Sequence, residues 1–284
     1  MNTLIEKIED FFRRNEVSVY GTCGIETVKG SRAGYSPSDI MPSAKGIVCM
    51  ALPFPKGIYQ CQKNMEIPYW WNSNLFFDNI DTIMLKLCNI IEQEGYQALP
   101  VNGCFPIDAT LESETLGYVN LIHLGAAVNI GKIGKNALLF NSRYGPRLIL
   151  GGIVTSAPLP AVTVPDEGQQ GCPEDCFVCV QNCPVNAIDG NGNIDIVKCM
   201  MYSARNPVLW VIRLLNRVVI PFLSMLKLVD KKGLYGRNLQ RLINLTYANN
   251  HSMFACINCV SMCPYRDSGL PVDSTTKKQS SDTL

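Results

Sequence analysis

The sequence predicts two parts: an α/β (α+β) domain built on a mixed sheet, followed by a smaller domain organised by cysteines. Three observations support this division. The chain has 284 residues, of which 47% are hydrophobic and 17% charged, enough to bury a substantial core. Its first half alternates apolar patterns of helical and strand period. Eight of its 13 cysteines lie between Cys172 and Cys263.

Apolar residues at helical spacing predict helices over residues 4–12 and 76–91, the second ending near Gly95. Residues 116–130 also read as a helix, closed by Gly131. Apolar runs of strand length predict strands over residues 17–22, 46–53, 98–101, 137–140 and 148–155. These elements together predict the sheet domain.

Prolines and glycines between residues 158 and 171 mark a joint between the two parts. We therefore expect domains over residues 1–165 and 166–267, followed by a polar, disordered tail over 268–284. The N-terminus reads as a charged amphipathic helix without the apolar core of a signal peptide, which predicts a cytoplasmic protein. Clustered cysteines in a reducing compartment indicate metal binding rather than disulfides.

The clustered cysteines form a duplicated motif. Cys176, Cys179 and Cys183 fit C-x2-C-x3-C-P, and the same pattern recurs in a second set made of Cys256, Cys259 and Cys263. This is the pattern of bacterial ferredoxins, in which the cysteine before the proline ligates the other cluster. The sequence thus predicts a ferredoxin-like domain with two [4Fe-4S] clusters.

The crossed rule gives each cluster four ligands. The first set is Cys172, Cys176, Cys179 and Cys263, and the second is Cys183, Cys199, Cys256 and Cys259. The chain departs from the pattern in two ways, because Cys172 and Cys176 are separated by three residues and Cys199 stands far ahead of Cys256. Paired C-x2-C units also build four-cysteine zinc sites, which is the competing interpretation. The scattered cysteines, which are Cys23, Cys49, Cys61, Cys88 and Cys104, read as core thiols.

Outside the cysteine motifs, five segments of the chain carry a resemblance to a known family. They are the block GKIGKN of residues 131–136, the segments YGPR (144–147) and LGGIVTSAP (150–158), the strand at 45–53 and the stretch 194–202. With the cysteines, these segments resemble epoxyqueuosine reductases, which are related to the core of reductive dehalogenases. The resemblance implies a cobalamin-dependent reductase in which two [4Fe-4S] clusters pass electrons to a corrinoid.

The resemblance also suggests site residues. The corrinoid would be bound by Gly131, Lys132, Ile133, Gly134, Lys135, Asn136 and Tyr144, the glycines allowing close approach of the backbone. A phosphate-binding loop is excluded because the spacing of G-x4-G-K-[ST] is absent. The proton donor expected in this family falls near Thr115, so Glu114 is the leading candidate acid. The alternatives are Asp108, Glu112, His123 and Tyr144.

A helical basic insertion is expected over residues 205–245. Residues 207–229 are strongly apolar but interrupted by Arg213, Arg217 and Lys227, and residues 205–241 carry eight basic residues and one acidic one. Three interpretations remain open: a cover over the clusters, a docking face for a protein partner or a membrane surface, or a grip on tRNA phosphates.

The sequence therefore predicts an iron-sulfur, cobalamin-dependent oxidoreductase that draws on a low-potential donor of ferredoxin or flavodoxin type. Epoxyqueuosine in tRNA is the substrate that the resemblance suggests. The alternative is a two-cluster electron carrier that docks a redox partner and binds no corrinoid.

Overall fold

We analysed a computed structural model of the protein, which describes residues 3–30, 34–103, 107–109, 115–117, 119–163, 171–203 and 256–267. The helices are α1 (Leu4–Arg14), α2 (Pro37–Ile40), α3 (Glu66–Gln93), α4 (Leu121–Ala127), α5 (Val178–Gln181), α6 (Ile196–Ser203) and α10 (Asn258–Ser261), with 3-10 turns η1 (Ile25–Thr27) and η2 (Lys56–Gln60). The strands are β1 (Val19–Gly24), β2 (Gly46–Pro53), β3 (Ala98–Val101), β4 (Ile107–Ala109), β5 (Thr115–Gly117), β6 (Lys132–Ile133), β7 (Leu139–Phe140), β8 (Leu148–Thr155) and β9 (Val162–Thr163).

Five strands form the central sheet, in the order β3-β8-β2-β1-β9. Every described pairing in it is antiparallel, so the prediction of a mixed sheet is wrong for these strands. The continuous apolar runs of β2 and β8 arise because both strands are buried on both faces, which occurs here in an antiparallel sheet. Since β2 and β3 both flank β8, helix α3 connects two parallel strands that have a third strand between them.

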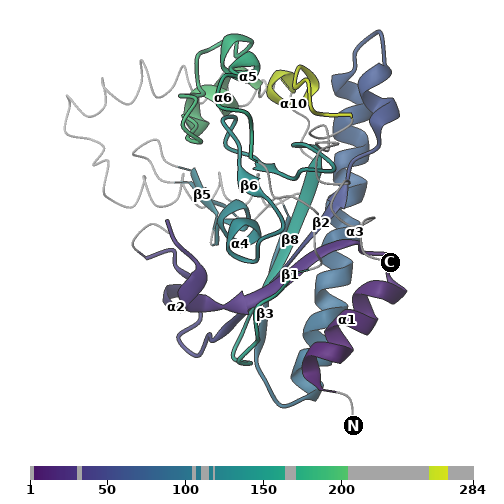
Figure 1. Ribbon diagram of the computed structural model, residues 1–284, viewed down its shortest axis with the longest axis vertical. Helices are drawn as coiled ribbons and strands as arrows, with labels where there is room; N and C mark the ends of the chain where they lie inside the picture. The colour runs from purple at the N-terminus through teal and green to yellow at the C-terminus, as the bar shows by residue number, and fades with distance from the viewer. Residues whose placement is uncertain are drawn as a thin grey trace, which may run out of the picture.

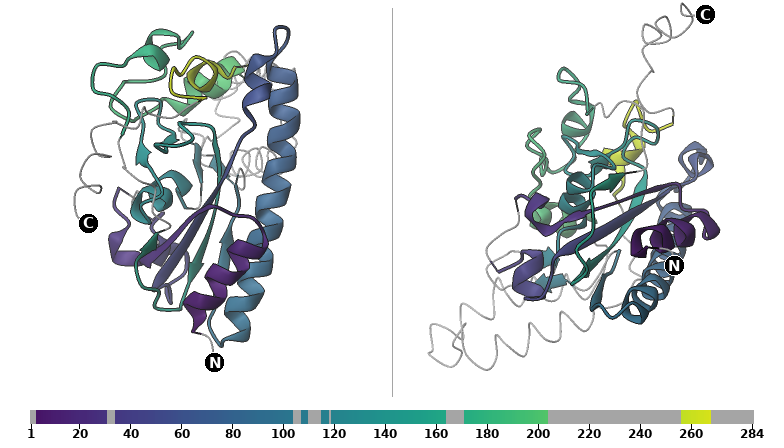
Figure 2. Two further views of the ribbon diagram at one scale, coloured as in Figure 1. Left: turned by 45° about the vertical axis from the view of Figure 1, so that its right-hand side comes forward. Right: turned by 60° about the horizontal axis from the view of Figure 1, so that its bottom comes forward.

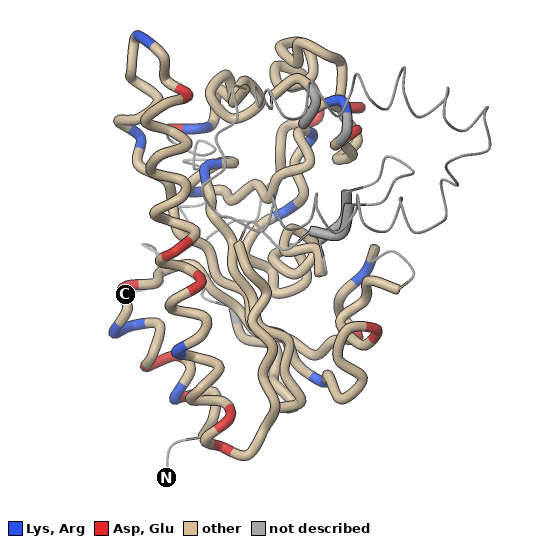
Figure 3. The backbone as a smooth tube through the Cα atoms, turned by 180° about the vertical axis from the view of Figure 1, so that it is seen from behind, with Lys and Arg blue, Asp and Glu red and all other residues tan. Residues whose placement is uncertain are grey.

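The two faces of the sheet support two separate cores. Alternate residues of β2 point to opposite faces: Val48 and Met50 pack beneath α1 and α3, whereas Cys49 and Ala51 pack beneath α4. Figure 1 shows α1 and α3 on one side of the sheet and α4 on the other. Charged residues lie on the helices and loops, and none lies in the four longest strands of the sheet (Figure 3).

Helix α1 begins and ends at clear sequence signals. Thr3 and Glu6 form a reciprocal capping box at its start. Arg13 and Arg14 occupy its last turn, where positive charges interact favourably with the helix dipole. Its buried face, Ile8 and Phe12, packs on α3 and the sheet. The helix predicted over residues 4–12 is therefore confirmed.

Helix α3 runs the full height of the molecule, as Figure 2 shows. It ends before Gly95 as predicted but begins ten residues earlier than the first residue of the predicted helix, at Glu66. The earlier start was missed because its first turns carry an exposed apolar stripe of Ile67, Trp71 and Leu75, which masks the expected periodicity. Among the described residues, no helix is long and apolar enough to cross a membrane.

The helix predicted over residues 116–130 is wrong over part of its length. Residues 115–117 form β5, which pairs with β4, and α4 begins after Asn120, whose side chain accepts hydrogen bonds from the backbone N–H groups of Ile122 and His123. Asn129 then adopts a left-handed conformation with φ of 66°, which ends the helix before Gly131. Asparagine residues at both ends of α4 therefore determine where the helix begins and ends, although the apolar pattern extends further.

The described part of the cysteine-rich region covers one end of the sheet domain. Helices α5, α6 and α10 lie together above β6 and β8 (Figure 1). Helices α5 and α10 also contact each other directly. The predicted basic insertion, the boundary near residue 165 and the predicted tail lie outside the described residues.

Close packing of α3 on the sheet depends on Gly151 in β8. A Cβ atom there would stand 2.9 Å from Cγ1 of Ile80, which is fully buried in the core. We expect Gly151→Val to destabilise the protein by about 1–3 kcal/mol, because the larger side chain forces α3 away from the sheet.

Urea unfolding followed by circular dichroism measures this loss. Gly57→Val is the control, because a Cβ at Gly57 meets open space. A loss of the same size in both variants would contradict the packing argument.

Candidate functional site

The two cysteine motifs fold into turns of the same geometry. The first cysteine turn (residues 172–183) contains the short helix α5. The second cysteine turn (residues 256–263) contains the short helix α10. In both turns the backbone N–H of the last cysteine donates to the carbonyl three residues earlier, over 3.2 Å. The duplication inferred from sequence is therefore also present in the backbone conformation.

The structure brings Cys263 of the second turn to the cysteines of the first. The pKa of the Cys263 thiol is raised to about 11, first by burial and then by the nearby thiols of Cys172, Cys176 and Cys179. We call these four the first thiol group. Its members come from both turns, as the crossed ligation rule predicts.

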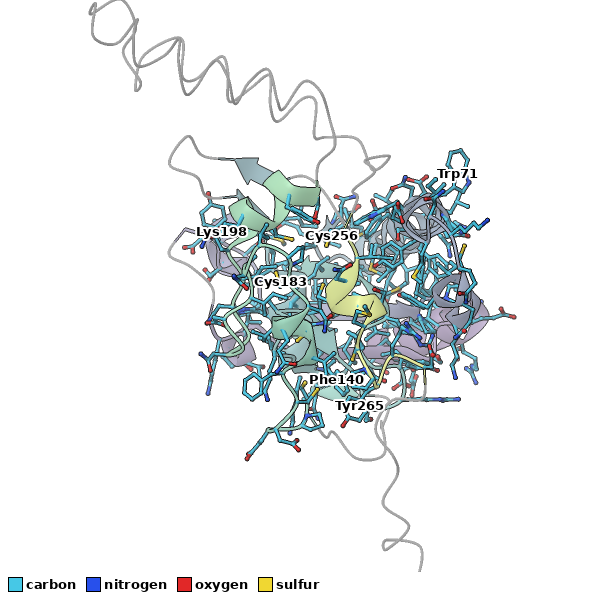
Figure 4. All side chains as sticks on the ribbon, turned by 90° about the horizontal axis from the view of Figure 1, so that it is seen from above. Trp71, Phe140, Cys183, Lys198, Cys256 and Tyr265 are labelled. Atoms are coloured by element: carbon cyan, nitrogen blue, oxygen red, sulfur yellow. The ribbon has the colours of Figure 1, made fainter. Side chains whose placement is uncertain are left out.

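The remaining four cysteines form the second thiol group. Burial raises the pKa of Cys259 to about 12, and the thiols of Cys199, Cys256 and Cys183 act in the same direction. Figure 4 shows Cys183 and Cys256 on neighbouring segments, seen from above. Cys259 also interacts with Cys179 of the first group, so the two groups adjoin.

Within the described segments, no three His, Cys, Asp or Glu side chains converge closely enough to bind one metal ion. Thiolates that hold a cuboidal cluster bind separate iron atoms and stand farther apart. Additional donors already surround the thiols. The backbone N–H of Ala187 donates to Cys183 Sγ over 3.2 Å, and a hydrogen bond from Ser203 lowers the pKa of Cys199, which burial raises.

Residues 131–136 form the β6 strand and the turn that follows it, directly below the cysteine turns. Cβ atoms at Gly131 and Gly134 would meet the protein's own chain, 2.7 Å from the Phe140 carbonyl oxygen and 3.0 Å from Asn136 Oδ1 respectively. The space that these glycines leave is thus filled by the β6-β7 hairpin. Lys132 and Ile133 remain exposed.

Lys135 holds the first cysteine turn. Its ammonium donates to the carbonyl oxygens of Pro173, over 2.8 Å, and of Glu174, and lies 3.8 Å from the centre of the Phe177 ring. These three residues flank Cys176 on both sides. Burial raises the pKa of the Cys172 thiol, while a hydrogen bond from the Lys135 backbone and the charge of its side chain lower it.

Asn136 holds the second cysteine turn. Its side chain is 6% exposed, and its Nδ2 donates to the carbonyl oxygen of Cys259 over 3.2 Å. Its Oδ1 accepts from the backbone N–H of Leu138 over 3.3 Å. Two consecutive residues of the sheet domain therefore bind one cysteine turn each.

Arg147, just before β8, binds the chain that follows the second cysteine turn. It is buried, and its Nε donates to the carbonyl oxygen of Arg266 over 2.8 Å while an Nη donates to that of Phe54. Tyr265 meets Phe140 of the hairpin edge-on, with ring centres 6.2 Å apart (Figure 4). Sequence analysis did not assign Arg147 a role, although it lies in the YGPR segment; only its partners, far away in sequence, reveal it.

Two of the candidate proton donors, His123 and Tyr144, have different surroundings. His123 on α4 has Nδ1 2.9 Å from the Lys29 carbonyl oxygen. Because a carbonyl only accepts hydrogen bonds, Nδ1 carries the proton and Nε2 is the free acceptor in neutral His123. The half-buried ring of Tyr144 lies under the guanidinium groups of Arg143 and Arg147, at 5.2 and 5.3 Å.

The acidic candidates are less well described. Asp108 lies in β4, opposite Leu116 of β5, and only its backbone is described. Glu112 and Glu114 lie outside the described residues. The structure therefore does not test which carboxylate supplies a proton.

The scattered cysteines agree with their interpretation as core thiols where they are described. Cys23, Cys49 and Cys88 are buried and Cys61 is half-buried. Burial raises the pKa of the Cys88 thiol to about 12 and of Cys49 higher still. Cys104 lies outside the described residues.

Fold and site together define a class: an antiparallel α+β domain joined to a duplicated cysteine-turn unit whose two thiol groups are crossed. Comparison with known proteins gives a more specific similarity. No family model matches the chain. Among curated proteins, it is 35% identical to the epoxyqueuosine reductase of Aliivibrio fischeri over 99 residues, which are 32% of this chain and 26% of that protein. It is 23% identical to that of Staphylococcus aureus over 188 residues, which are 61% and 46% of the two chains.

Solved structures show the same similarity. A crystal structure of selenomethionine-labelled epoxyqueuosine reductase matches 95% of this chain and 68% of its own, with a TM-score of 0.57 and 14% identity. Another epoxyqueuosine reductase structure, with an epoxyqueuosine-modified tRNA stem loop, matches 72% and 58% with a TM-score of 0.50 and 14% identity. The resemblance to epoxyqueuosine reductases is thus confirmed, and the chain shares their fold, while it spans less than half the length of the two curated relatives it matches.

The Asn136 contact can be tested by two substitutions. Asn136→Leu should destabilise the protein by about 1–3 kcal/mol, because it leaves the buried Cys259 carbonyl without its donor. Asn136→Asp retains the acceptor for Leu138 but places a carboxylate against the Cys259 carbonyl, so we expect a loss at least as large.

Urea unfolding of the metal-free protein measures both losses. Wild-type stability in the Asp variant would show that the Cys259 contact does not hold the second cysteine turn.

Proposed function

We propose that this protein is an iron-sulfur, cobalamin-dependent reductase of the epoxyqueuosine reductase type. Two [4Fe-4S] clusters, bound by the first and second thiol groups, would pass electrons toward the substrate-reducing cofactor. The observation that carries the proposal is the crossed grouping of eight thiols, four drawn together by Cys263 and four by Cys259. A two-cluster ferredoxin domain needs this arrangement.

The residues present fit two clusters. Each thiol group has four members, and each receives hydrogen bonds from the chain, from Ala187 to Cys183 and from the Lys135 backbone to Cys172. Cys259 of the second group interacts with Cys179 of the first, so the residues that would hold the two clusters adjoin each other, as electron transfer between clusters requires. Hydrogen bonds and local charge would set the order of reduction.

Fewer residues of the 131–136 block are available to contact a corrinoid than the sequence suggests. Bound cobalamin would supply a cobalt centre that, once reduced by the clusters, is a strong enough reductant for substrate reduction. Lys135 and Asn136 are engaged by the cysteine turns, so Lys132 and Ile133 are the residues of the 131–136 block left exposed to contact it. His123, whose ring is fixed by the Lys29 carbonyl, and Tyr144 would exchange protons, together with Asp108 or Glu114.

Epoxyqueuosine in tRNA is the proposed substrate. The curated relatives are named for this activity, and one structural neighbour is described with an epoxyqueuosine-modified tRNA stem loop. The basic stretch 205–241, which carries eight basic residues and one acidic residue, supports binding to a phosphate backbone. A low-potential ferredoxin or flavodoxin would supply the electrons.

One observation favours a second function, that of a two-cluster electron carrier without a corrinoid. The side chains of Lys135 and Asn136 donate their hydrogen bonds to the cysteine turns. Their presence in the 131–136 block is therefore explained without a bound corrinoid. The carrier would retain both clusters and dock a redox partner.

Anaerobic reconstitution with iron, sulfide and cobalamin separates the two functions. A reductase should retain about eight irons and one cobalt after desalting, and then reduce epoxyqueuosine in tRNA when supplied with a low-potential reductant. About eight irons without cobalt would leave the carrier, and zinc in place of iron would overturn both.

Paired cysteine substitutions test the crossed ligation. Cys179→Ala with Cys263→Ala removes two ligands from one group, so we expect about four irons to remain. Cys179→Ala with Cys183→Ala removes one ligand from each group, although both lie in one turn, and should leave few or none.

Iron analysis and electron paramagnetic resonance after reconstitution provide the measurement. If the second pair retains more iron than the first, each turn binds its own cluster and the crossed assignment is wrong.

A further inference from the structure

The two thiol groups differ in the charge that surrounds them. The first group has the Lys135 ammonium against its first turn, held by the carbonyl oxygens of Pro173 and Glu174 and by the face of Phe177. Four contacts with the first turn, including the one from its backbone to Cys172, fix Lys135 there. Lys135 is therefore positioned beside a cluster rather than on a free surface.

Other charged residues near the first group are less able to act on a cluster bound there. Arg266 interacts with Cys263, but its guanidinium forms a bidentate pair with Asp267 at 2.9 and 2.8 Å, which offsets its charge. Glu174 and Asp175 are acidic but exposed, where water and salt screen them. Lys135 is only half-exposed, so its charge is screened less.

The second group has no matching cation in the part of its turns that the structure describes. Lys198 precedes Cys199 in sequence, but it is exposed and pairs with Asp195 over 3.1 Å. Cys259 packs against the main core of the sheet domain, where its thiol is poorly solvated. The two groups thus offer unequal environments to an added electron.

We propose that Lys135 is a positioning residue that raises the reduction potential of the cluster bound by Cys172, Cys176, Cys179 and Cys263. This inference rests on the proposed function, because it requires that both clusters are present. Reduction adds one negative charge to a cluster, and a fixed neighbouring cation stabilises the reduced form more than the oxidised form. As far as the charges of the described residues decide it, the first cluster is the more easily reduced of the two.

The variant that tests this is Lys135→Gln. Glutamine retains a side-chain donor for the Pro173 and Glu174 carbonyls and leaves the backbone contact to Cys172 in place, but removes the charge. Lys132→Gln is the matched control: it removes the same charge from the same hairpin, at an exposed position.

The measurement is an anaerobic redox titration followed by electron paramagnetic resonance on reconstituted protein. We expect Lys135→Gln to retain about eight irons and to lower the higher of the two potentials, leaving the other unchanged, while Lys132→Gln moves both potentials by much less. Equal shifts in the two variants, an unchanged higher potential or a shift of the lower potential alone would overturn the inference.

Iron content separates the remaining outcomes. If Lys135→Gln binds only about four irons, the ammonium is needed to form the first cysteine turn. The inference that Lys135 sets the reduction potential is then wrong. If the wild-type protein itself binds fewer than about eight irons, the two-cluster function fails instead.

Discussion

Both cysteine turns depend on one tight turn of the sheet domain, between β6 and β7. Lys135 binds carbonyl oxygens of the first cysteine turn, and Asn136 binds a carbonyl oxygen of the second. The next residue, Ala137, has a φ of 60°, a left-handed conformation that costs an L-residue about 1–2 kcal/mol. Hydrogen bonds between Gly134 and both Ala137 and Leu138 hold the turn in this shape, so that adjacent side chains reach separate segments.

The rest of the sheet domain determines where that turn lies. Helix α4 packs on one face of the sheet and contacts β6, and strand β8 begins at Leu148, directly after Arg147. Arg147 then binds the backbone at Arg266, beyond the last cysteine. Contacts from two separate segments of the sheet domain therefore fix the cysteine-rich region, which explains why few of its own residues need to form a core.

Much of the fold is predictable from local pattern. Strands β2, β3 and β8 have the bounds that their apolar runs predict, and in β2 and β8 burial on both faces leaves a continuous signal. Strand direction was not predictable, since an apolar run is the same in parallel and antiparallel sheets. The crossed grouping of the cysteines is predicted by their spacing, and their division between two clusters stays a prediction. The roles of Lys135 and Asn136 were not predictable, because their partners lie 38 and 123 residues away.

The crossed grouping of the thiols has a consequence for the order in which the protein is made. The first thiol group joins Cys172 to Cys263, and the second joins Cys183 to Cys259. A ribosome that has released the whole first cysteine turn has completed neither group, since each waits for residues synthesised at least 70 positions later. Assembly of the two proposed clusters would therefore wait until the second cysteine turn has been synthesised, by which time the sheet domain has emerged and can hold both turns. A chain truncated before Cys256 would carry five of these eight thiols and no complete group of four.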